Sequence, residues 1–310
     1  MILSIDFRTD IPAFYSEWLL NRFEEGYLMF RNPTAPNTVH KVILDKDHIE
    51  GIFWCSKNYA PIFKRLHEIT DNFPSVFHYT ITGYDETIEP NVPSLETTLN
   101  TFKALAMTYG AKKTIWRFDP IFYTKEFGET ETLERFERIC KDICSYTDRV
   151  VINFCTPYEK VKKHMPDIIF LNDIQKKVLL FNLLGICKKY NLKLQTCGNG
   201  LQFKDLEGVE VTGCLDKNAL SLMGINTDYN RKATQWGCLC YPNTSIGAYN
   251  TCMHKCKYCY ASADFDQCEK NYYINHDPHS PLLIGHLNPE DKVIEMKPKL
   301  LNTNQLTLEL

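Results

Sequence analysis

The feature that most constrains the fold is a repeated alternation of short apolar segments with longer segments of helical period. Segments rich in β-branched and aromatic residues predict seven strands, at 2–6, 51–55, 76–82, 114–118, 149–155, 192–197 and 209–214. Asp10, Ser94, Asp173 and Asp216 stand where helix N-caps are expected, and Gly110 and Gly224 stand at helix ends. A hairpin over 27–44 could add an eighth strand.

Repeated β–α units of this kind build a parallel sheet covered by helices. Seven or eight units in the first 230 residues favour a TIM-like (β/α) barrel, complete or partly open, over a doubly wound sheet. From about Arg231 the rhythm stops, and the chain becomes rich in glycine, asparagine, proline and cysteine. We therefore expect an α/β protein with a barrel domain at 1–230 and a cysteine-rich region at 231–310 that packs on the barrel mouth.

Composition fits a protein with a large core, since 44% of the 310 residues are hydrophobic and 24% are charged. The first residues show no basic leader or long apolar core, and no apolar run reaches the length of a membrane span. These features predict a cytoplasmic protein. A net charge of −3 argues against a general nucleic-acid coat, which needs a basic surface.

Three cysteines lie close together in the C-terminal region, with C-x3-C-x2-C spacing: Cys252, Cys256 and Cys259. An iron–sulfur cubane normally takes four protein thiolates, so three would leave one iron open to a ligand from elsewhere. Zinc sites more often contain paired C-x2-C units. The spacing therefore indicates an open-site [4Fe-4S] cluster.

This triad, flanked by Tyr258 and Tyr260, resembles the signature of radical S-adenosylmethionine enzymes. The sequences at 8–15, 116–120 and 237–260 resemble an uncharacterised bacterial and archaeal family with such a motif near its C-terminus. The triad is also similar to that of spore photoproduct lyase and its relatives. These resemblances imply a [4Fe-4S] cluster, S-adenosylmethionine, and an electron donor such as flavodoxin or ferredoxin. Unlike most radical-SAM relatives, this chain carries the triad after the barrel strands.

Polar side chains at the carboxyl ends of barrel strands are candidates for the site, because active sites of barrels lie at that face. We expect cofactor binding by Arg8, Asp10, Lys57, Asn58, Thr80, Asn153 and Tyr258. Asp10 and Asn58 could equally be helix caps. Arg117 and Asp119 are two apart in one strand and share a face, which favours a catalytic pair in contact with ligand, or a pair that neutralises itself.

Four other cysteines fall at strand ends or just before the triad: Cys197, Cys214, Cys238 and Cys240. They could hold an auxiliary [4Fe-4S] cluster. Alternatively, Cys197 and Cys214 are small core residues, and the other two join the triad in a zinc site.

The remaining thiols have weaker assignments. Cys140, Cys144 and Cys187 lie in amphipathic segments and are expected to pack in the core. Cys268 is a spare thiol. Within the triad loop, His254 is expected at the surface.

Taken together, these patterns predict a radical S-adenosylmethionine-type enzyme that forms a 5′-deoxyadenosyl radical and takes hydrogen from a substrate. The alternatives are an iron–sulfur electron-transfer or sensor protein whose fourth thiolate comes from Cys268 or Cys240, and a zinc-stabilised binding protein. A small molecule, a peptide and a nucleotide all remain possible substrates. Nucleic acid is the weaker candidate, because no basic stripe interleaved with aromatic residues is present.

Overall fold

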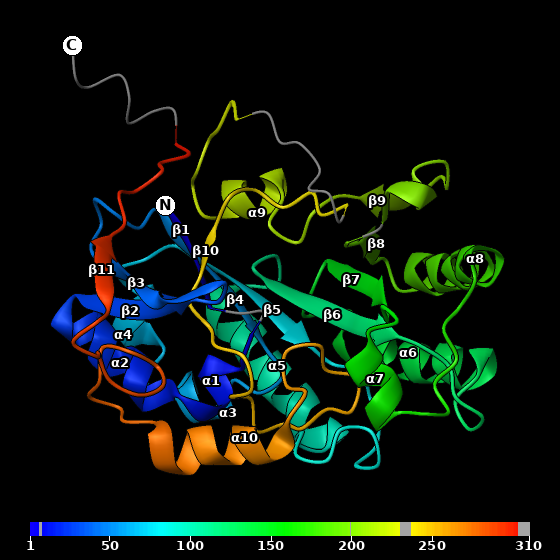
Figure 1. Cartoon of the computed structure of the whole chain (residues 1–310). Coiled ribbons are helices and arrows are strands. Elements are labelled where there is room, and N and C mark those ends of the chain that lie inside the picture. The colour runs from blue at the N-terminus through cyan, green and yellow to red at the C-terminus, as the bar shows by residue number, and fades with distance from the viewer. Residues whose placement is uncertain (6–7, 199, 230–236, 303–310) are drawn as a thin grey trace.

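A computed structural model describes residues 1–5, 8–198, 200–229 and 237–302. Its main element is a sheet of eight parallel strands in the order β10-β1-β4-β5-β6-β7-β8-β9 (Figure 1). The strands are β1 (Ile2–Ile5), β4 (Gly51–Ser56), β5 (Ser75–Thr80), β6 (Thr114–Ile121), β7 (Arg149–Phe154), β8 (Lys193–Thr196), β9 (Val209–Val211) and β10 (Thr244–Ser245). All seven predicted strands are confirmed.

The predicted hairpin exists, but it does not supply the eighth strand of the large sheet. Its strands, β2 (Tyr27–Asn32) and β3 (Ala35–Ile43), form a separate small sheet with β11 (Lys292–Glu295). The eighth strand is β10, which pairs with β1 through Leu3 and Ser4. The C-terminal region therefore extends both sheets.

The large sheet is open in the described residues, because β10 and β9 are its edges and do not pair with each other. Every pairing within it is parallel, as expected for repeated β–α units. The α/β class is thus confirmed, and closure into a barrel is not observed.

Helices connect successive strands. They are α1 (Ile11–Phe14), α2 (Ser16–Glu25), α3 (Ala60–Phe63), α4 (His67–Thr70), α5 (Leu95–Tyr109), α6 (Glu129–Ile143), α7 (Glu159–His164), α8 (Asp173–Lys189), α9 (Lys217–Leu222) and α10 (Phe265–Lys270), with a 3₁₀ turn at Gly200–Phe203 and a π turn at Asn271–Asn275. Asp10, Ser94 and Asp216 accept from the backbone as N-caps, as predicted. The prediction for Asp173 is wrong by one residue, because Asn172 forms a reciprocal capping box with Gln175.

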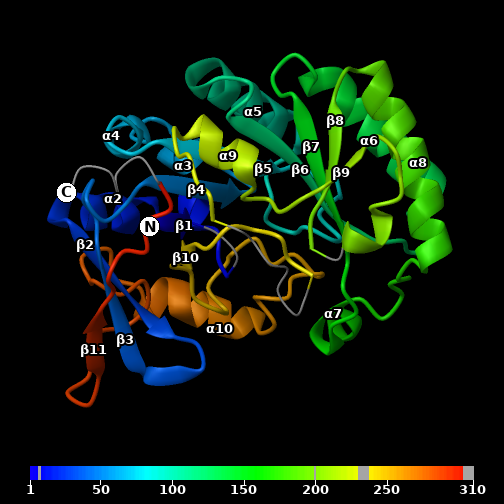
Figure 2. The same cartoon turned by 90° about the horizontal axis from the view of Figure 1, so that it is seen from above.

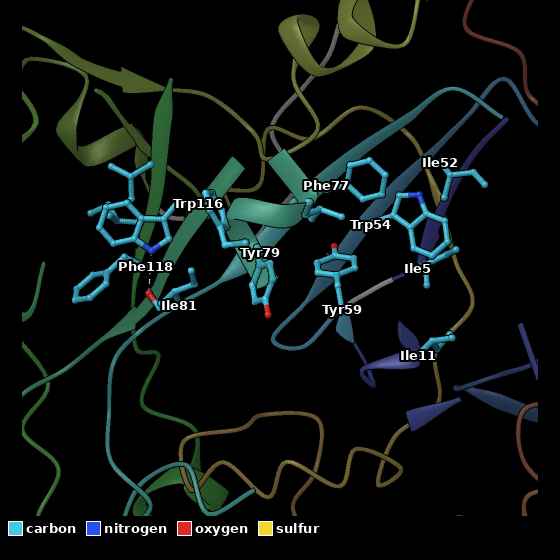
Figure 3. Close-up of a cluster of buried hydrophobic side chains, with 14 of the residues drawn as sticks. Ile5, Ile11, Ile52, Trp54, Tyr59, Phe77, Tyr79, Ile81, Trp116 and Phe118 are labelled. Atoms are coloured by element: carbon cyan, nitrogen blue, oxygen red, sulfur yellow. Dashed lines mark hydrogen bonds between the residues drawn. The ribbon is translucent and has the colours of Figure 1, made fainter. Parts of the chain in front are cut away.

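The two faces of the sheet bury different cores. On one face, aromatic side chains such as Trp54, Phe77 and Trp116 pack beneath the helices (Figure 3). Because side chains alternate along a strand, Phe53 and Ile115 point to the other face and pack with Leu220 of α9. Figure 1 shows α9 and α10 on opposite sides of the sheet.

In the view from above of Figure 2, α10 lies in the lower half of the picture and α5 and α6 lie in the upper half. None of the helices in the described ranges is long and apolar enough to cross a membrane.

Candidate functional site

The cysteine loop at 252–259 is fixed to the sheet by His254. The prediction that His254 is exposed is wrong, since only 2% of it is accessible. Its Nε2 lies 2.9 Å from Oδ2 of Asp10, and its Nδ1 lies 3.1 Å from the Asn91 carbonyl oxygen. Each ring nitrogen of His254 thus faces an acceptor oxygen of another segment. The buried imidazole therefore links the loop to Asp10, which precedes α1.

A second set of contacts ties the same loop to the segment after β5. Asn91 donates through its side chain to the Met253 carbonyl at 2.7 Å and through its backbone to the His254 carbonyl at 3.2 Å. The backbone N–H of Lys257 donates to the Ile88 carbonyl at 3.0 Å. The loop is thus held on both sides, which limits the freedom of the cysteines within it.

The triad thiols act on one another electrostatically, and Cys256 is buried while Cys252 and Cys259 are partly exposed. Burial, together with the neighbouring thiols, raises the pKa of Cys252, and burial raises the pKa of Cys256. Sγ of Cys259 accepts from the backbone N–H groups of Ala261 at 3.3 Å and Ser262 at 3.4 Å. Such N–H···S contacts are known to tune iron–sulfur clusters.

In the described ranges, no three His, Cys, Asp or Glu side chains are arranged to hold one ion, at the triad or elsewhere. The triad thiols nevertheless interact electrostatically with one another. Ligands of a cluster bind different irons and stand farther apart than ligands of one ion.

Glu89, which the sequence analysis missed, is the centre of a buried network beside the triad. Its Oε1 accepts from Lys57 Nζ at 2.8 Å, from Thr82 Oγ1 at 2.7 Å and from the Tyr258 hydroxyl. Burial opposes the charge on Glu89, but Lys57 outweighs it and the pKa of Glu89 is lowered. Burial likewise opposes the charge on Lys57, yet Glu89 raises the pKa of Lys57 overall. Lys57 and Tyr258 therefore lie at the triad, as expected.

Two of the residues predicted to bind the cofactor make several contacts with other parts of the protein. Arg8 donates to the carbonyls of Gly247 at 2.6 Å and Ser245 at 2.7 Å. Asp10 accepts from the Ser56 hydroxyl at 2.6 Å and the Lys57 backbone N–H at 2.8 Å, as well as from His254. These side chains position the loop and the strand ends.

The other predicted positions lie along the same edge. Asn58 forms a turn just before α3, whose N-cap is Tyr59, since its Oδ1 accepts from the Ala60 N–H at 3.0 Å. Thr80 is buried at the end of β5, and Asn153 lies at the end of β7. A small pocket with a volume of about 80 Å³ adjoins Asn153, between Cys155, Lys176 and Cys197.

Arg117 and Asp119 form the predicted pair on one face of β6. Their side chains are in direct ionic contact. Arg117 also donates through Nη1 to the Cys214 Sγ at 2.8 Å, and the Asp119 carboxylate acts on Lys57 as well. The pair lies between the triad network and the thiol of Cys214.

The four remaining candidate cysteines converge in a second group. The Sγ atoms of Cys197 and Cys214 are 2.6 Å apart. The thiol of Cys240 lies within hydrogen-bonding reach of Cys197, Cys214 and Cys238. Contact with Cys214 and Cys240 lowers the pKa of Cys197 despite its burial. Cys240 therefore belongs to this group, whereas the triad lies beside Glu89 and Asp10.

Other cysteines take the roles expected of them. Cys140 and Cys187 are fully buried in the apolar core, and Cys144 packs against it. Cys268 is buried in α10, where the Cys259 thiol acts on it electrostatically. Cys268 is thus a neighbour of the triad.

A family model with the description Domain of unknown function (DUF1848) matches residues 2–261 of the chain. That range includes both cysteine groups and every strand of the large sheet. No curated protein matches the chain, and no solved structure matches it.

Proposed function

We propose, starting from the fact that the chain belongs to the family described as a domain of unknown function, that it is an iron–sulfur enzyme of the radical S-adenosylmethionine type. Cys252, Cys256 and Cys259 would hold a [4Fe-4S] cluster with one open iron. The observation that carries the proposal is a buried three-cysteine loop, fixed through His254 and Asn91 over the carboxyl ends of β1 and β5.

When bound, such a cluster can reduce S-adenosylmethionine to methionine and a 5′-deoxyadenosyl radical, which takes a hydrogen atom from the substrate. The chain's own residues bind, orient and shield. Asp10 and Asn91 hold the cysteine loop in place. The N–H groups of Ala261 and Ser262 stabilise negative charge on Cys259 sulfur.

The buried Glu89 network would line one wall of the site with charged side chains and exclude water from it. Lys57 lies 5.6 Å from the centroid of the Tyr258 ring, between Glu89 and the thiols. The positive charge of Lys57 would attract the negative charge of a thiolate-bound cluster and so stabilise it. Thr80 and Asn153 were also predicted to bind the cofactor, and their side chains take no part in the contacts that hold the cysteine loop.

The fold supports this placement by analogy. In this proposal the open parallel sheet is a partly open barrel, residues 1–230 form the barrel domain, and residues 231–310 form the cap that carries the cluster. Arg117 and Asp119 would then lie on the inner face and contact the substrate. The substrate would be a small molecule, peptide or nucleotide, and a flavodoxin or ferredoxin would supply the electron.

A second candidate function rests on the position of Cys268. A thiol buried beside Cys259 could supply a fourth ligand and close the cluster, which would then serve electron transfer or sensing. Cys240 is a poorer fourth ligand, because it contacts the other cysteine group. A zinc-stabilised binding protein is the third candidate.

Spectroscopy of the cluster tests the open iron. The protein is purified anaerobically and reduced, and its electron paramagnetic resonance spectrum is recorded with and without S-adenosylmethionine. A shift of the cluster signal on addition is expected, because the cofactor becomes a ligand of one iron. An unchanged spectrum of an intact cluster would favour the closed site.

A further inference from the structure

We propose that Cys197, Cys214, Cys238 and Cys240 form a second metal centre with four thiolate ligands. Two forms share this ligand chemistry, namely an auxiliary iron–sulfur cluster and a tetrahedral zinc ion. The proposal concerns thiols outside the triad, so it does not depend on the first cluster.

One thiol of this group lies close to the three others. Cys197 follows β8, Cys214 follows β9, and the other two precede β10, yet Cys240 lies within hydrogen-bonding reach of all three partners. A disulfide joins a thiol to one partner only. A metal ion or cluster gathers four thiols at once, which accounts for a thiol with three thiol neighbours.

The second argument is that the backbone itself brings these segments together. A Cβ atom on Gly213 would lie 2.4 Å from the backbone nitrogen of Cys240, so this position admits only glycine without a shift of the chain. Next to it, the N–H of Tyr241 donates to the Leu215 carbonyl at 2.9 Å. The convergence is therefore fixed by main-chain packing, not by rotamers alone.

The third argument is electrostatic. Four thiolates carry a large negative charge, and a buried charge needs a partner. Arg117 is buried and donates to Cys214 Sγ at 2.8 Å. His78 is also fully buried beside this group, and within the described part of the chain neither of its ring nitrogens makes a hydrogen bond of normal geometry. The surroundings thus offer one cation, Arg117, to the thiols, whereas burial lowers the pKa of His78 to about 3 and keeps its ring neutral.

Binding requires a small movement. Two sulfurs that share one zinc at ~2.3 Å stand about 3.8 Å apart in a tetrahedral site, whereas Cys197 and Cys214 are 2.6 Å apart. One of these two sulfur atoms must therefore move by about an ångström to bind zinc. To bind a cluster, the two sulfur atoms would have to move farther apart than that. Cys197 is partly exposed, so its side chain has room for this shift.

The test begins with a variant that has lost the first site. In a Cys252→Ala/Cys256→Ala/Cys259→Ala background, metal and sulfide are measured by elemental analysis after purification without chelators, and folding is checked by circular dichroism. We expect about one zinc per chain without sulfide, or iron and sulfide in equal amounts near four. Either result supports the second centre and identifies its form.

Further substitutions in that background assign the ligands. Cys214→Ser and Cys238→Ser should each reduce the retained metal at least tenfold, whereas Cys155→Ser, at the neighbouring strand end, should leave it unchanged. The Cys238 variant guards against a folding defect, because its side chain is partly exposed. A folded background protein without metal, metal that survives both changes, or a Cys197–Cys214 disulfide found by mass spectrometry would each overturn the proposal.

Discussion

Nε2 of His254 lies 2.9 Å from Oδ2 of Asp10, which places a buried polar contact between the cysteine loop and the segment that follows the first strand of the sheet. The two residues are 244 positions apart in sequence. Two carboxylate oxygens of Asp10 also cap α1 and bind the end of β4. One side chain thus joins three segments at the carboxyl edge of the sheet.

Replacing Asp10 should loosen this junction. Asp10→Ala leaves His254 buried without its anionic partner, so we expect a loss of ~3–5 kcal/mol in the free energy of unfolding. Iron retained after anaerobic reconstitution should fall as well. Urea denaturation and iron analysis measure the two effects.

The matched control is Asp45→Ala. Asp45 pairs with His48 at 2.7 Å, but both side chains are partly exposed to solvent. Exposed pairs contribute ~0–1 kcal/mol, so this variant should resemble the wild type. If the Asp10 and Asp45 variants had the same free energy of unfolding and the same iron content, the buried contact would not be what holds the loop.

Removing the charge of Glu89 should destabilise the other side of the site. In Glu89→Gln the Lys57 ammonium remains buried without a counter-ion, and the Tyr258 hydroxyl loses an anionic acceptor. We expect a lower melting temperature and faster loss of iron to a chelator. Glu137→Gln is the control, because Glu137 binds Lys189 and Tyr190 in the same way at the surface. If the melting temperature fell and iron was lost equally in the Glu89 and Glu137 variants, Glu89 would have no special role in the site.

The same residue predicts a pH dependence. The pKa of Glu89 is below its ordinary value of 4.5 in the folded state, so its ionised form adds stability above that pH. This contribution decreases as the pH falls through the lowered pKa. Between pH 5 and pH 3 the wild type should therefore lose more unfolding free energy than Glu89→Gln, as measured by denaturant titration. If the unfolding free energies of the two proteins fell equally over this pH range, ionisation of Glu89 would make no contribution to stability.

Cys268→Ala distinguishes the open cluster from the closed one. The account predicts normal iron content and an unchanged electron paramagnetic resonance spectrum, because Cys252, Cys256 and Cys259 suffice. Since Cys268 is fully buried, the change from Cys to Ala removes only one sulfur and should be tolerated. Loss of the cluster in a folded variant would instead make Cys268 the fourth ligand.

Alkylation separates structural thiols from exposed ones. Burial raises the pKa of Cys187 to about 12 and raises the pKa of Cys140 as well. Both should resist iodoacetamide in the folded protein, since the thiolate is the reactive form. Cys144, partly exposed and next to α6, should react before both of them. Peptide mass spectrometry after brief labelling gives the order, and early labelling of Cys140 would contradict the packing described.

The sequence was sufficient where local pattern decides the structure. β-Branched and aromatic segments located all strands from β4 to β9, and Ser94 and Asp216 marked helix starts by capping chemistry. The pairing of β11 with β3 was missed because it joins segments about 250 residues apart. No local pattern encodes such a partner.

The site was predictable in part for the same reason. The triad and the second cysteine group are visible as spacings and strand ends, so their residues could be named in advance. Glu89 and His254 could not be assigned, because each depends on distant partners for burial and charge. Acidic residues are frequent around Glu89 in the sequence, and nothing local distinguishes the buried one.

The most direct test of the central claim is the release of 5′-deoxyadenosine. The anaerobically reconstituted protein is reduced with dithionite in the presence of S-adenosylmethionine, and the products are quantified by liquid chromatography and mass spectrometry. The account predicts 5′-deoxyadenosine in at least equimolar amount from the wild type and none from Cys256→Ala. Absence of 5′-deoxyadenosine from a wild-type protein with an intact, reduced [4Fe-4S] cluster would contradict it.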